Sequence, residues 1–458
     1  MASEASYDAI IVGSGIAGSA LAHALGRDGR RVLLIERDWS EPDRIVGELL
    51  QPGGVESLRK LGLVECLEDI DAVPTHGYSV YYRGAPVHLE YLEKPGTEKR
   101  YQGRSFHHGR FVMKLRAAAR QCENVTALEG TVTEVVHDAG SGRAIGVKAT
   151  SKESGKSQTY HAGLTVVCDG CFSKFRKTYI DRPVDVRSHF VGLVLKDAVI
   201  PSPNHGHVIL GDHSPILVYQ ISQHDTRMLV DIQGKLPAAG NGDLRAALEK
   251  IVIGNVPDDL VPSFQRALDT DRLRSMPNSY LPPTTGQTPG LLMLGDAYNM
   301  RHPLTGGGMS VALNDVVILR ALLSPSEVPD LDDDANVADH LREFQTKRKS
   351  LSVVVNVLAQ CLYALFAGSD PCLRRLQGGC FHYFRRGGLC VDEPVGLLSC
   401  MLPAPFTLFY HFFAVAFYTL YIMFSEAPLY QYPALAVESV RVIYTAAVTL
   451  LPYVWYEC

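Results

Sequence analysis

Three glycines near the start of the chain, Gly13, Gly15 and Gly18, have the spacing of a phosphate-binding turn. They follow the apolar run YDAIIV and precede a helix-like segment, SALAHALGRDG, and a second apolar run that ends at Glu36. In this order of strand, turn, helix and strand, the first glycine permits a tight turn and the second lets the backbone approach a pyrophosphate. The third lets helix and strand pack closely, and the helix N-terminus presents free N–H groups to the phosphates. The pattern predicts a dinucleotide site.

Glu36 narrows the choice of dinucleotide. It stands at the end of the second apolar run, where a carboxylate can accept hydrogen bonds from both ribose hydroxyls. A carboxylate in this place disfavours a 2′-phosphate, so FAD or NAD is expected rather than NADP. The chain contains one such motif, and a second Rossmann unit that would bind NADPH durably is therefore not expected.

Two later segments favour FAD over NAD. The run LTVVCDG places Asp169 at the end of one apolar strand, and LLMLGDAYNM places Gly295 and Asp296 at the end of another. An aspartate at such a position can accept hydrogen bonds from a ribityl chain. The glycines at 306–308 precede a helix, so they can lie flat against a planar ring and direct the helix dipole at the negative charge of a reduced flavin. Taken singly, each aspartate could be an ordinary turn residue and the three glycines could be an ordinary flexible loop. The occurrence of all three motifs in this order favours a flavin.

Composition excludes several classes of protein. The chain has 458 residues, which exceeds the roughly 100–200 residues of one domain, so two or three units are expected. Its 44 Lys and Arg oppose 49 Asp and Glu, and a net charge of −5 gives no global field for nucleic acid. Charged residues are only 20% of the chain, which argues against disorder and favours a globular enzyme that touches a membrane.

The ten cysteines are too sparse for a disulfide-stabilised secreted fold. No signal peptide is recognisable at the N-terminus, so the thiols are expected in a reducing compartment. Cys168 and Cys171 form a C-x-x-C pair without the second pair that zinc requires, and no metal site is predicted. Structural thiols are favoured there over a redox dithiol.

Apolar residues are concentrated towards the C-terminus. The run from Phe406 to Phe424 has nineteen residues, no charge and nine aromatic rings. Residues 351–367 and 442–456 are also uncharged, and the basic residues 347–349 precede them. The length suits a spanning helix, whereas the aromatic density is typical of the membrane interface. Membrane contact is favoured over a buried helical hairpin, and both monotopic and spanning arrangements remain open.

The order of strand-like and helix-like segments around these motifs predicts an α/β protein, which is of the α+β class when all its parts are counted. A Rossmann-type FAD-binding domain carries an inserted antiparallel-sheet substrate domain, indicated by runs such as HVIL, PILVYQI and RMLVDIQG, and a C-terminal helical region associates with membrane. The predicted boundaries are 1–83, 105–182 and 284–345 for the FAD-binding domain, 84–104 and 183–283 for the substrate domain, and 346–458 for the helical region. The acidic loop SPSEVPDLDDD marks a surface connection.

With these motifs assembled, the chain resembles the FAD-dependent aromatic-hydroxylase superfamily and, within it, the squalene monooxygenase (squalene epoxidase) family. The strings that carry the resemblance are RDWSEPDRIVGELLQPGG, GRSFHHGRF, TVVCDGCFSKFRK, SHFVGLVLK, LRSMPNSYLPP and LGDAYNMRHPLTGGGM. They extend over the span from Tyr7 to Met309, and HFFAVAFY adds a match in the tail.

The resemblance implies an enzyme that inserts one oxygen atom of O2 into squalene, which gives (S)-2,3-oxidosqualene for sterol biosynthesis. It also implies electrons from NADPH through an NADPH-cytochrome reductase. The expected location is the cytoplasmic face of the endoplasmic reticulum membrane, with attachment through the C-terminal region. A thirty-carbon hydrocarbon partitions into lipid almost completely at ~0.8 kcal/mol per CH2, which gives the aromatic tail a function.

The resemblance also implies site residues. The positions that match FAD-contacting residues are Ile16, Ala17, Glu36, Arg37, Arg44, Leu49, Arg116, Val132, Asp296 and Met309. The glycine and aspartate motifs add Gly13, Gly15, Gly18, Asp169, Gly295, Gly307 and Gly308. Tyr78 matches a family tyrosine that is linked through a glutamine, here Gln51, to the flavin, and these two are the expected catalytic residues. Leu49 departs from the phenylalanine of some relatives, a hydrophobic exchange of little consequence.

An isolated alkene has no proton to remove, so its epoxidation requires apolar walls rather than an acid–base pair. No carboxylate pair or Ser/His/Asp arrangement stands out in the sequence, in agreement with this requirement. His107 and His108 resemble a metal pair, but adjacent residues on a strand point to opposite faces, so structural hydrogen bonding is preferred.

Two alternatives remain. One is a flavin-dependent hydroxylase or reductase that acts on another membrane-dissolved prenyl lipid or quinone. The other is a non-catalytic, membrane-bound flavoprotein. Oxygen incorporation into product separates epoxidation and hydroxylation from reduction, and retained flavin-facing residues argue against the non-catalytic protein.

Overall fold

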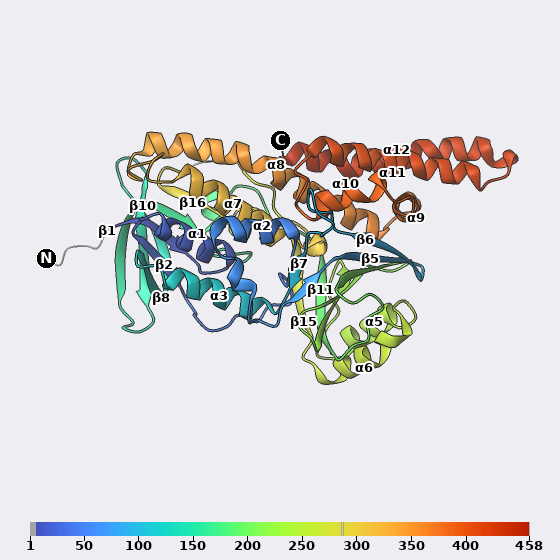
Figure 1. Cartoon of the computed structure of the whole chain (residues 1–458), viewed down its shortest axis with the longest axis horizontal. Coiled ribbons are helices and arrows are strands. Elements are labelled where there is room, and N and C mark those ends of the chain that lie inside the picture. The colour runs from blue at the N-terminus through green and yellow to red at the C-terminus, as the bar shows by residue number, and fades with distance from the viewer. Residues whose placement is uncertain (1–5, 285, 287, 458) are drawn as a thin grey trace.

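The computed structural model describes residues 6–284, 286 and 288–457 and has three parts (Figure 1). One part is a parallel-stranded unit with flanking helices, the second is a larger, mainly antiparallel sheet, and the third is a group of helices along one edge of the molecule (Figure 1). The predicted fold class, a Rossmann-type unit with an inserted sheet and a C-terminal helical region, is confirmed.

The first sheet places the predicted nucleotide motifs at one edge. Its strands, in the order of pairing, are β1 (Ser6–Val12), β2 (Val32–Glu36), β8 (Val125–His137), β9 (Ala144–Ser151), β10 (Ser157–Val167) and β16 (Leu291–Met293), and β1 also pairs with β10. β1 runs parallel to β2 and β10, and β10 runs parallel to β16. Because carboxyl ends of parallel strands meet at one edge, Gly13, Asp169 and Asp296 are brought to the same side of the sheet.

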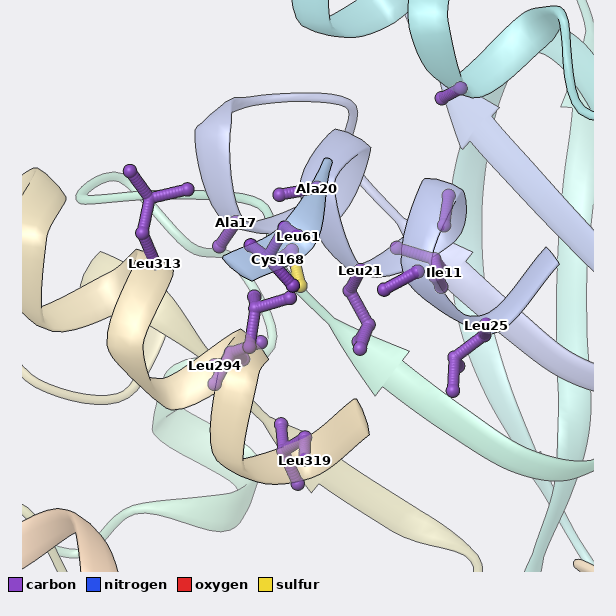
Figure 2. Packing of buried hydrophobic residues seen from close by; sticks show 14 of the residues in the cluster. Ile11, Ala17, Ala20, Leu21, Leu25, Leu61, Cys168, Leu294, Leu313 and Leu319 are labelled. Atoms are coloured by element: carbon purple, nitrogen blue, oxygen red, sulfur yellow. The ribbon is translucent and has the colours of Figure 1, made fainter. Parts of the chain in front are cut away.

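Helices cover this sheet with a continuous apolar core. They are α1 (Ile16–Arg27), α2 (Pro52–Leu61), α3 (His108–Arg120) and α7 (Gly308–Leu322). Figure 2 shows Leu21 and Leu25 of α1 close to Leu319 of α7 and to Ile11 of β1, with Leu294 beside them. These side chains are at most 1% exposed. Such a fully buried core holds the turn between β1 and α1 rigidly.

The second sheet has seven strands. In the order of pairing they are β15 (Arg274–Tyr280), β11 (Asp185–Lys196), β14 (Asp225–Gln233), β13 (Ile216–Gln220), β12 (His205–Leu210), β5 (Gly77–Tyr82) and β6 (Ala85–Glu90). All pairs are antiparallel except β12 with β5. α5 (Asp243–Val252) and α6 (Val261–Thr270) cover one face through Leu248 and Phe264. The other face carries Tyr78 and Leu217 and packs towards the C-terminal helices.

The predicted domain boundaries remain a prediction, and sheet membership departs from them at one strand. β5 lies within the predicted segment 1–83 of the FAD-binding domain but belongs to the second sheet. The physical reason is long-range pairing with β12, which no local pattern near residue 80 reveals. The short elements are β3 (Leu49–Leu50), β4 (Val73–Thr75), β7 (Gly103–Ser105), α4 (Arg176–Tyr179), and the 3-10 turns η1 (Val64–Leu67), η2 (Asp258–Leu260), η3 (Gly295–Ala297) and η4 (Pro303–Thr305).

The third part consists of helices. They are α8 (Asp334–Ala367), α9 (Pro371–Phe384), α10 (Leu389–Leu398), α11 (Pro405–Ser425), η5 (Leu429–Gln431) and α12 (Tyr432–Glu457). By length and composition alone, three segments among the described residues are apolar enough to cross a membrane: α8, α11 and η5 with α12. Protein buries 67% of the apolar window of α8 but only 28% and 22% of the other two windows. α8 is therefore a core helix, whereas α11 and α12 lie side by side with much apolar surface exposed (Figure 1).

Candidate functional site: a nucleotide cavity and an apolar pocket

A cavity of about 270 Å³ lies between the two large sheets. One wall comes from the carboxyl ends of β1, β10 and β16 and includes Gly15, Cys168 and Gly295. The opposite wall comes from the second sheet and includes Tyr78 and Leu217. Ten of the predicted site residues line the cavity: Gly15, Ile16, Ala17, Arg44, Leu49, Tyr78, Gly295, Asp296, Gly308 and Met309.

The glycine turn fits a dinucleotide. Gly13 has φ +98°, and a Cβ there would lie 2.6 Å from the carbonyl oxygen of Cys168. A Cβ on Gly18 would lie 1.9 Å from the carbonyl oxygen of Gly13, so helix and turn are in direct contact. Gly15 differs, because a Cβ there would meet no atom within 4 Å and would project into open space in the cavity wall. The first and last glycines are thus needed for packing, and the middle one leaves room for a ligand.

Glu36 is oriented by the same turn. Its carboxylate accepts a hydrogen bond from the backbone N–H of Ser14 at 2.7 Å, and Arg116 approaches it at 3.6 Å. Arg116 also donates to the carbonyl oxygen of Ser14 at 3.0 Å. Burial lowers the pKa of Arg116, and the charge of Glu36 opposes that effect. Arg116 therefore fixes the Glu36 carboxylate and the turn. The cofactor contacts of Glu36 and Arg116 stay predictions.

The two aspartates of the later motifs differ in position. Asp296 lines the cavity; burial raises the pKa of its carboxyl group, while the charges of Arg301, Arg176 and Arg44 lower it. Asp169 lies behind the wall, where its carboxylate accepts from the backbone N–H of Lys174 at 3.2 Å. Burial also raises the pKa of Asp169. Of the two, Asp296 is the one that a bound ligand can reach directly.

The remaining predicted residues lie outside the cavity wall. A Cβ on Gly307 would lie 2.4 Å from Val355, so this glycine serves the contact with α8. Arg37 is exposed, and Val132 is buried in β8, where its carbonyl oxygen accepts from Lys174. Gln51, at the N-terminus of α2, is buried and contacts the cavity-lining Tyr78. The cofactor contacts of Gly307, Arg37 and Val132 stay predictions.

Tyr78 and Gln51 are joined as expected, and the structure adds a third residue. The Gln51 amide donates to the Tyr78 hydroxyl at 2.5 Å and to the carbonyl oxygen of Thr305 at 2.7 Å. The hydroxyl of Tyr91 donates to the Gln51 carbonyl at 2.8 Å, and the Tyr78 and Tyr91 rings meet edge to face. Burial raises the pKa of Tyr78 far above its ordinary value, so the hydroxyl stays neutral. Sequence reasoning missed Tyr91, which lies beyond β6 and has no motif of its own.

A buried ion pair next to the cavity was also missed. Arg227 of β14 donates two hydrogen bonds of 2.8 Å to the carboxylate of Glu48, which lines the cavity. Tyr219 donates to the same carboxylate at 3.4 Å. Burial lowers the pKa of Arg227, but the hydrogen bonds to Glu48 and its charge, together with smaller contributions from Tyr219 and Asp43, more than offset it. The pair connects the strand-β3 loop to the second sheet. The GELLQPGG string contains Glu48 but gives no sign of its partner.

A second cavity of about 70 Å³ lies among α8, α9, α10 and α11. Its walls are almost wholly apolar: Leu358, Cys361, Leu362, Leu365, Leu376, Cys380, Phe384, Pro394, Leu397, Leu398, Leu408, Phe412 and Val415. The polar exceptions are Tyr383, which is 2.8 Å from His411, and His411 itself, which is 2.6 Å from Glu393. One apolar cluster includes Tyr78 and Leu304 of the first cavity and Leu376 and Phe384 of the second. The two cavities are therefore joined by continuous apolar packing.

The histidine and cysteine pairs make separate contacts, and His108, Cys168 and Cys171 line the first cavity. His107 and His108 stand at the start of α3 and not on a strand; His107 contacts Asp225 at 2.9 Å and His108 contacts the carbonyl oxygen of Gly47 at 2.8 Å. Within the described residues, no group of three or more His, Cys, Asp or Glu is placed to hold a metal ion. Cys168 and Cys171 are free thiols whose pKa is raised by burial, which fits structural thiols better than a redox dithiol.

Comparison with known sequences identifies similar proteins along nearly the whole chain. The family profile described as squalene epoxidase matches residues 161–436, and a profile of NAD(P)-binding Rossmann-like domains matches residues 11–40. The squalene epoxidase erg1 of Aspergillus fumigatus is 49% identical over 452 residues, which cover 98% of this chain and 93% of that protein. The squalene monooxygenase of Mus musculus is 47% identical over 453 residues, covering 98% of this chain and 78% of that protein.

Solved structures share the fold at lower identity. The p-nitrophenol 4-monooxygenase PnpA of Pseudomonas putida superimposes with a TM-score of 0.70 at 16% identity, covering 86% of this chain and 98% of PnpA. HpxO of Klebsiella pneumoniae, solved with FAD and uric acid, gives a TM-score of 0.64 at 18% identity, with 87% of this chain and 97% of HpxO covered. At these identities the similarity shows the fold alone.

Proposed function

The chain belongs to the squalene epoxidase family, and from this membership we propose a FAD-dependent monooxygenase that converts squalene to (S)-2,3-oxidosqualene with O2 in sterol biosynthesis. The observation that carries the proposal is the position of Tyr78. It lines the nucleotide cavity and belongs to the apolar cluster that extends to the second cavity. A residue at this junction lies where cofactor and hydrocarbon must meet.

The residues present fit FAD. Gly15 leaves open space in the wall, Asp296 faces the cavity, and the turn holds Glu36, which would accept hydrogen bonds from the ribose. When bound, reduced FAD would supply the electrons that activate O2, and O2 would supply the oxygen atom that is transferred to squalene. The remaining predicted contacts, Arg44, Leu49 and Met309 among them, belong to this proposal. It also includes a FAD-binding unit built on the first sheet and a substrate unit built on the second.

The chain's own task is to bind and orient the alkene and to exclude water. Because a trisubstituted alkene has no proton to remove, apolar walls suffice at the reacting end. The second cavity supplies such walls for the remainder of the squalene molecule. Each CH2 group that is buried there contributes ~0.8 kcal/mol to the binding free energy. Tyr78, fixed by Gln51, is the polar group at the junction, and we assign it a hydrogen bond that holds the reacting groups in place.

The electron donor and location complete the proposal. The chain contains one matched Rossmann-like domain, at residues 11–40, so electrons from NADPH are expected to arrive through a separate NADPH-cytochrome reductase. The exposed apolar surface of α11 and α12 supports attachment to a membrane, from which a hydrocarbon substrate can enter. We place the protein on the cytoplasmic face of the endoplasmic reticulum membrane.

Oxygen-18 labelling tests this function directly. Purified protein in detergent receives FAD, squalene, NADPH and a microsomal reductase under labelled O2, and mass spectrometry follows the product. Oxidosqualene carrying one heavy oxygen is expected, and omission of the reductase should abolish it. Loaded flavin that is reduced by the reductase without yielding labelled oxidosqualene contradicts the proposal.

The open space at Gly15 gives a test of the cofactor site. Gly15→Ala is expected to fold normally but to bind FAD about tenfold more weakly, or ~1.4 kcal/mol, because the added methyl group enters the cavity. Quenching of FAD fluorescence on titration measures the affinity. Gly240→Ala is the matched control, since a Cβ there also meets no atom within 4 Å but lies outside the cavity. If Gly15→Ala and Gly240→Ala bind FAD with equal affinity, FAD does not bind against Gly15 in this cavity.

The exposed rings of α11 and α12 give a test of membrane attachment. Phe406, Phe417 and Trp455 are 91%, 60% and 81% exposed. Their combined replacement by serine is expected to weaken vesicle binding at least tenfold, since each buried aromatic side chain contributes roughly 1.5–3 kcal/mol. Flotation with phospholipid vesicles measures the bound fraction. Replacement of the exposed Val199 and Ile253 by serine should leave it unchanged, because neither residue lies on these helices.

A further inference from the structure

The end of α12 lies inside the protein although most of that helix is exposed. Glu457, the last residue of α12, is 2% exposed. Its carboxylate accepts a hydrogen bond from the side-chain amide of Asn356 on α8 at 2.9 Å. A carboxylate buried in apolar surroundings is costly unless a cation compensates it. The partners of Asn356 identify that cation.

A chain of amide groups leads from Glu457 to an arginine. The Asn356 amide also donates to the side-chain oxygen of Asn299 at 3.1 Å. The same oxygen accepts from Arg301 at 2.7 Å, and Arg301 donates to the backbone oxygen of Asn299 at 3.0 Å. All four side chains are buried. Three consecutive side-chain contacts thus connect the end of α12 with Arg301.

Arg301 is the cation that requires a counter-charge. It lines the nucleotide cavity, and among the described residues its Nε and one terminal nitrogen have no hydrogen-bond partner. The neighbouring Arg348 also donates to the side-chain oxygen of Asn299, at 3.3 Å, but Asp315 pairs with it at 2.8 Å. Among the described residues, no carboxylate lies within salt-bridge distance of Arg301. Burial lowers the pKa of Arg301, and the charges of Asp296, Asp315 and Glu457 oppose that shift.

We propose that Glu457, through Asn356 and Asn299, positions Arg301 at the wall of the flavin cavity and balances part of its positive charge. The inference rests on the proposed binding of FAD in that cavity. A positive charge there favours reduced over oxidised flavin, because reduction adds negative charge in a medium of low dielectric constant. The seating of α12 thereby contributes to the redox potential of the cofactor, in addition to membrane attachment.

The midpoint potential of bound FAD tests this charge pairing in the full chain. Arg301→Gln removes the cation and is expected to lower the ratio of reduced to oxidised flavin about tenfold at a fixed potential, which is about 30 mV for a two-electron couple. Glu457→Gln keeps an acceptor for Asn356 but removes the negative charge. Burial raises the pKa of Glu457 to about 7, so the shift in the opposite direction is expected in full at a pH well above that value. Glu426→Gln, the same change at an exposed residue beside α11, should leave the potential unchanged.

The double variant distinguishes a pair from two independent charges. The charge of Arg301 lowers the pKa of Glu457, so without Arg301 more of the buried carboxylate is protonated, and Glu457→Gln should add a smaller shift in the Arg301→Gln background than in the wild type. Additive shifts, shifts of equal sign or a Glu457→Gln value equal to that of Glu426→Gln would overturn the proposal. Arg301→Lys keeps the charge and is expected to stay within threefold of the wild-type ratio; a shift as large as that of Arg301→Gln would assign the effect to lost packing.

These measurements need bound flavin but no squalene. A wild-type chain that takes up no FAD would contradict the proposed function itself. A wild-type chain that takes up FAD, with variants that do not shift its potential, would contradict only the pairing of Glu457 with Arg301.

Discussion

Replacement of Tyr78 by phenylalanine is expected to lower kcat for squalene epoxidation about 100-fold, the magnitude typical of a lost preorganised hydrogen bond in an active site. The hydroxyl of Tyr78 is held at 2.5 Å from the Gln51 amide, and Tyr78 lines the nucleotide cavity and belongs to the apolar cluster that extends to the second cavity. Phenylalanine keeps the aromatic ring and its contact with Tyr91 but lacks the hydroxyl group. Product formation and reductase-driven consumption of NADPH should be measured together, because misplaced substrate also lowers the product formed per NADPH.

Tyr81→Phe is the matched control for this experiment. Tyr81 is buried on the same strand, β5, but belongs to the core on the opposite face of the sheet, where its ring stacks on His207. We expect its kcat to stay within twofold of the wild-type value. FAD content should be equal in both variants, since neither change touches the glycine turn. A Tyr78→Phe enzyme as active as Tyr81→Phe would remove Tyr78 from the catalytic machinery.

Arg227→Met is expected to lower the free energy of unfolding by about 3–5 kcal/mol, the usual effect of breaking a buried ion pair on one side. Glu48 is 1% exposed, and two of its three hydrogen bonds come from Arg227. Methionine fills a similar space but leaves the carboxylate buried without a counter-charge. Denaturant unfolding followed by protein fluorescence measures the change.

Two further variants separate charge from packing. Glu48→Gln in the Arg227→Met background should recover much of the lost stability, because a neutral amide replaces the unpaired charge. Arg83→Met breaks an exposed pair with Asp212 and is expected to cost less than about 1 kcal/mol. A similar loss for Arg83→Met and Arg227→Met would show that burial of the Glu48 pair does not decide its contribution.

Local motifs were sufficient to predict the nucleotide half of the site. A turn that needs positive φ at Gly13, contact at Gly18 and open space at Gly15 is built from six consecutive residues, so its requirements are readable from the sequence. The ends of parallel strands likewise bring Asp296 to the cavity because the topology of the fold is standard. The apolar C-terminal region was predicted from composition alone, since hydropathy accumulates over whole helices.

The tertiary structure determines which polar side chains pair around these motifs. Glu48 and Arg227 are 179 residues apart, and Asn356 and Glu457 are 101 residues apart. Tyr91 reaches Gln51 only because the β5–β6 hairpin folds back beside Tyr78.

Strand register and helix packing set such pairings, and a charged or amide side chain carries no local signal of the partner it will meet. The amino-acid sequence by itself therefore determined that this protein binds a dinucleotide and has an apolar C-terminal surface of the kind that can associate with a membrane. The tertiary structure decided how the polar groups between those two surfaces are paired, because burial makes each of them dependent on a partner distant in the chain.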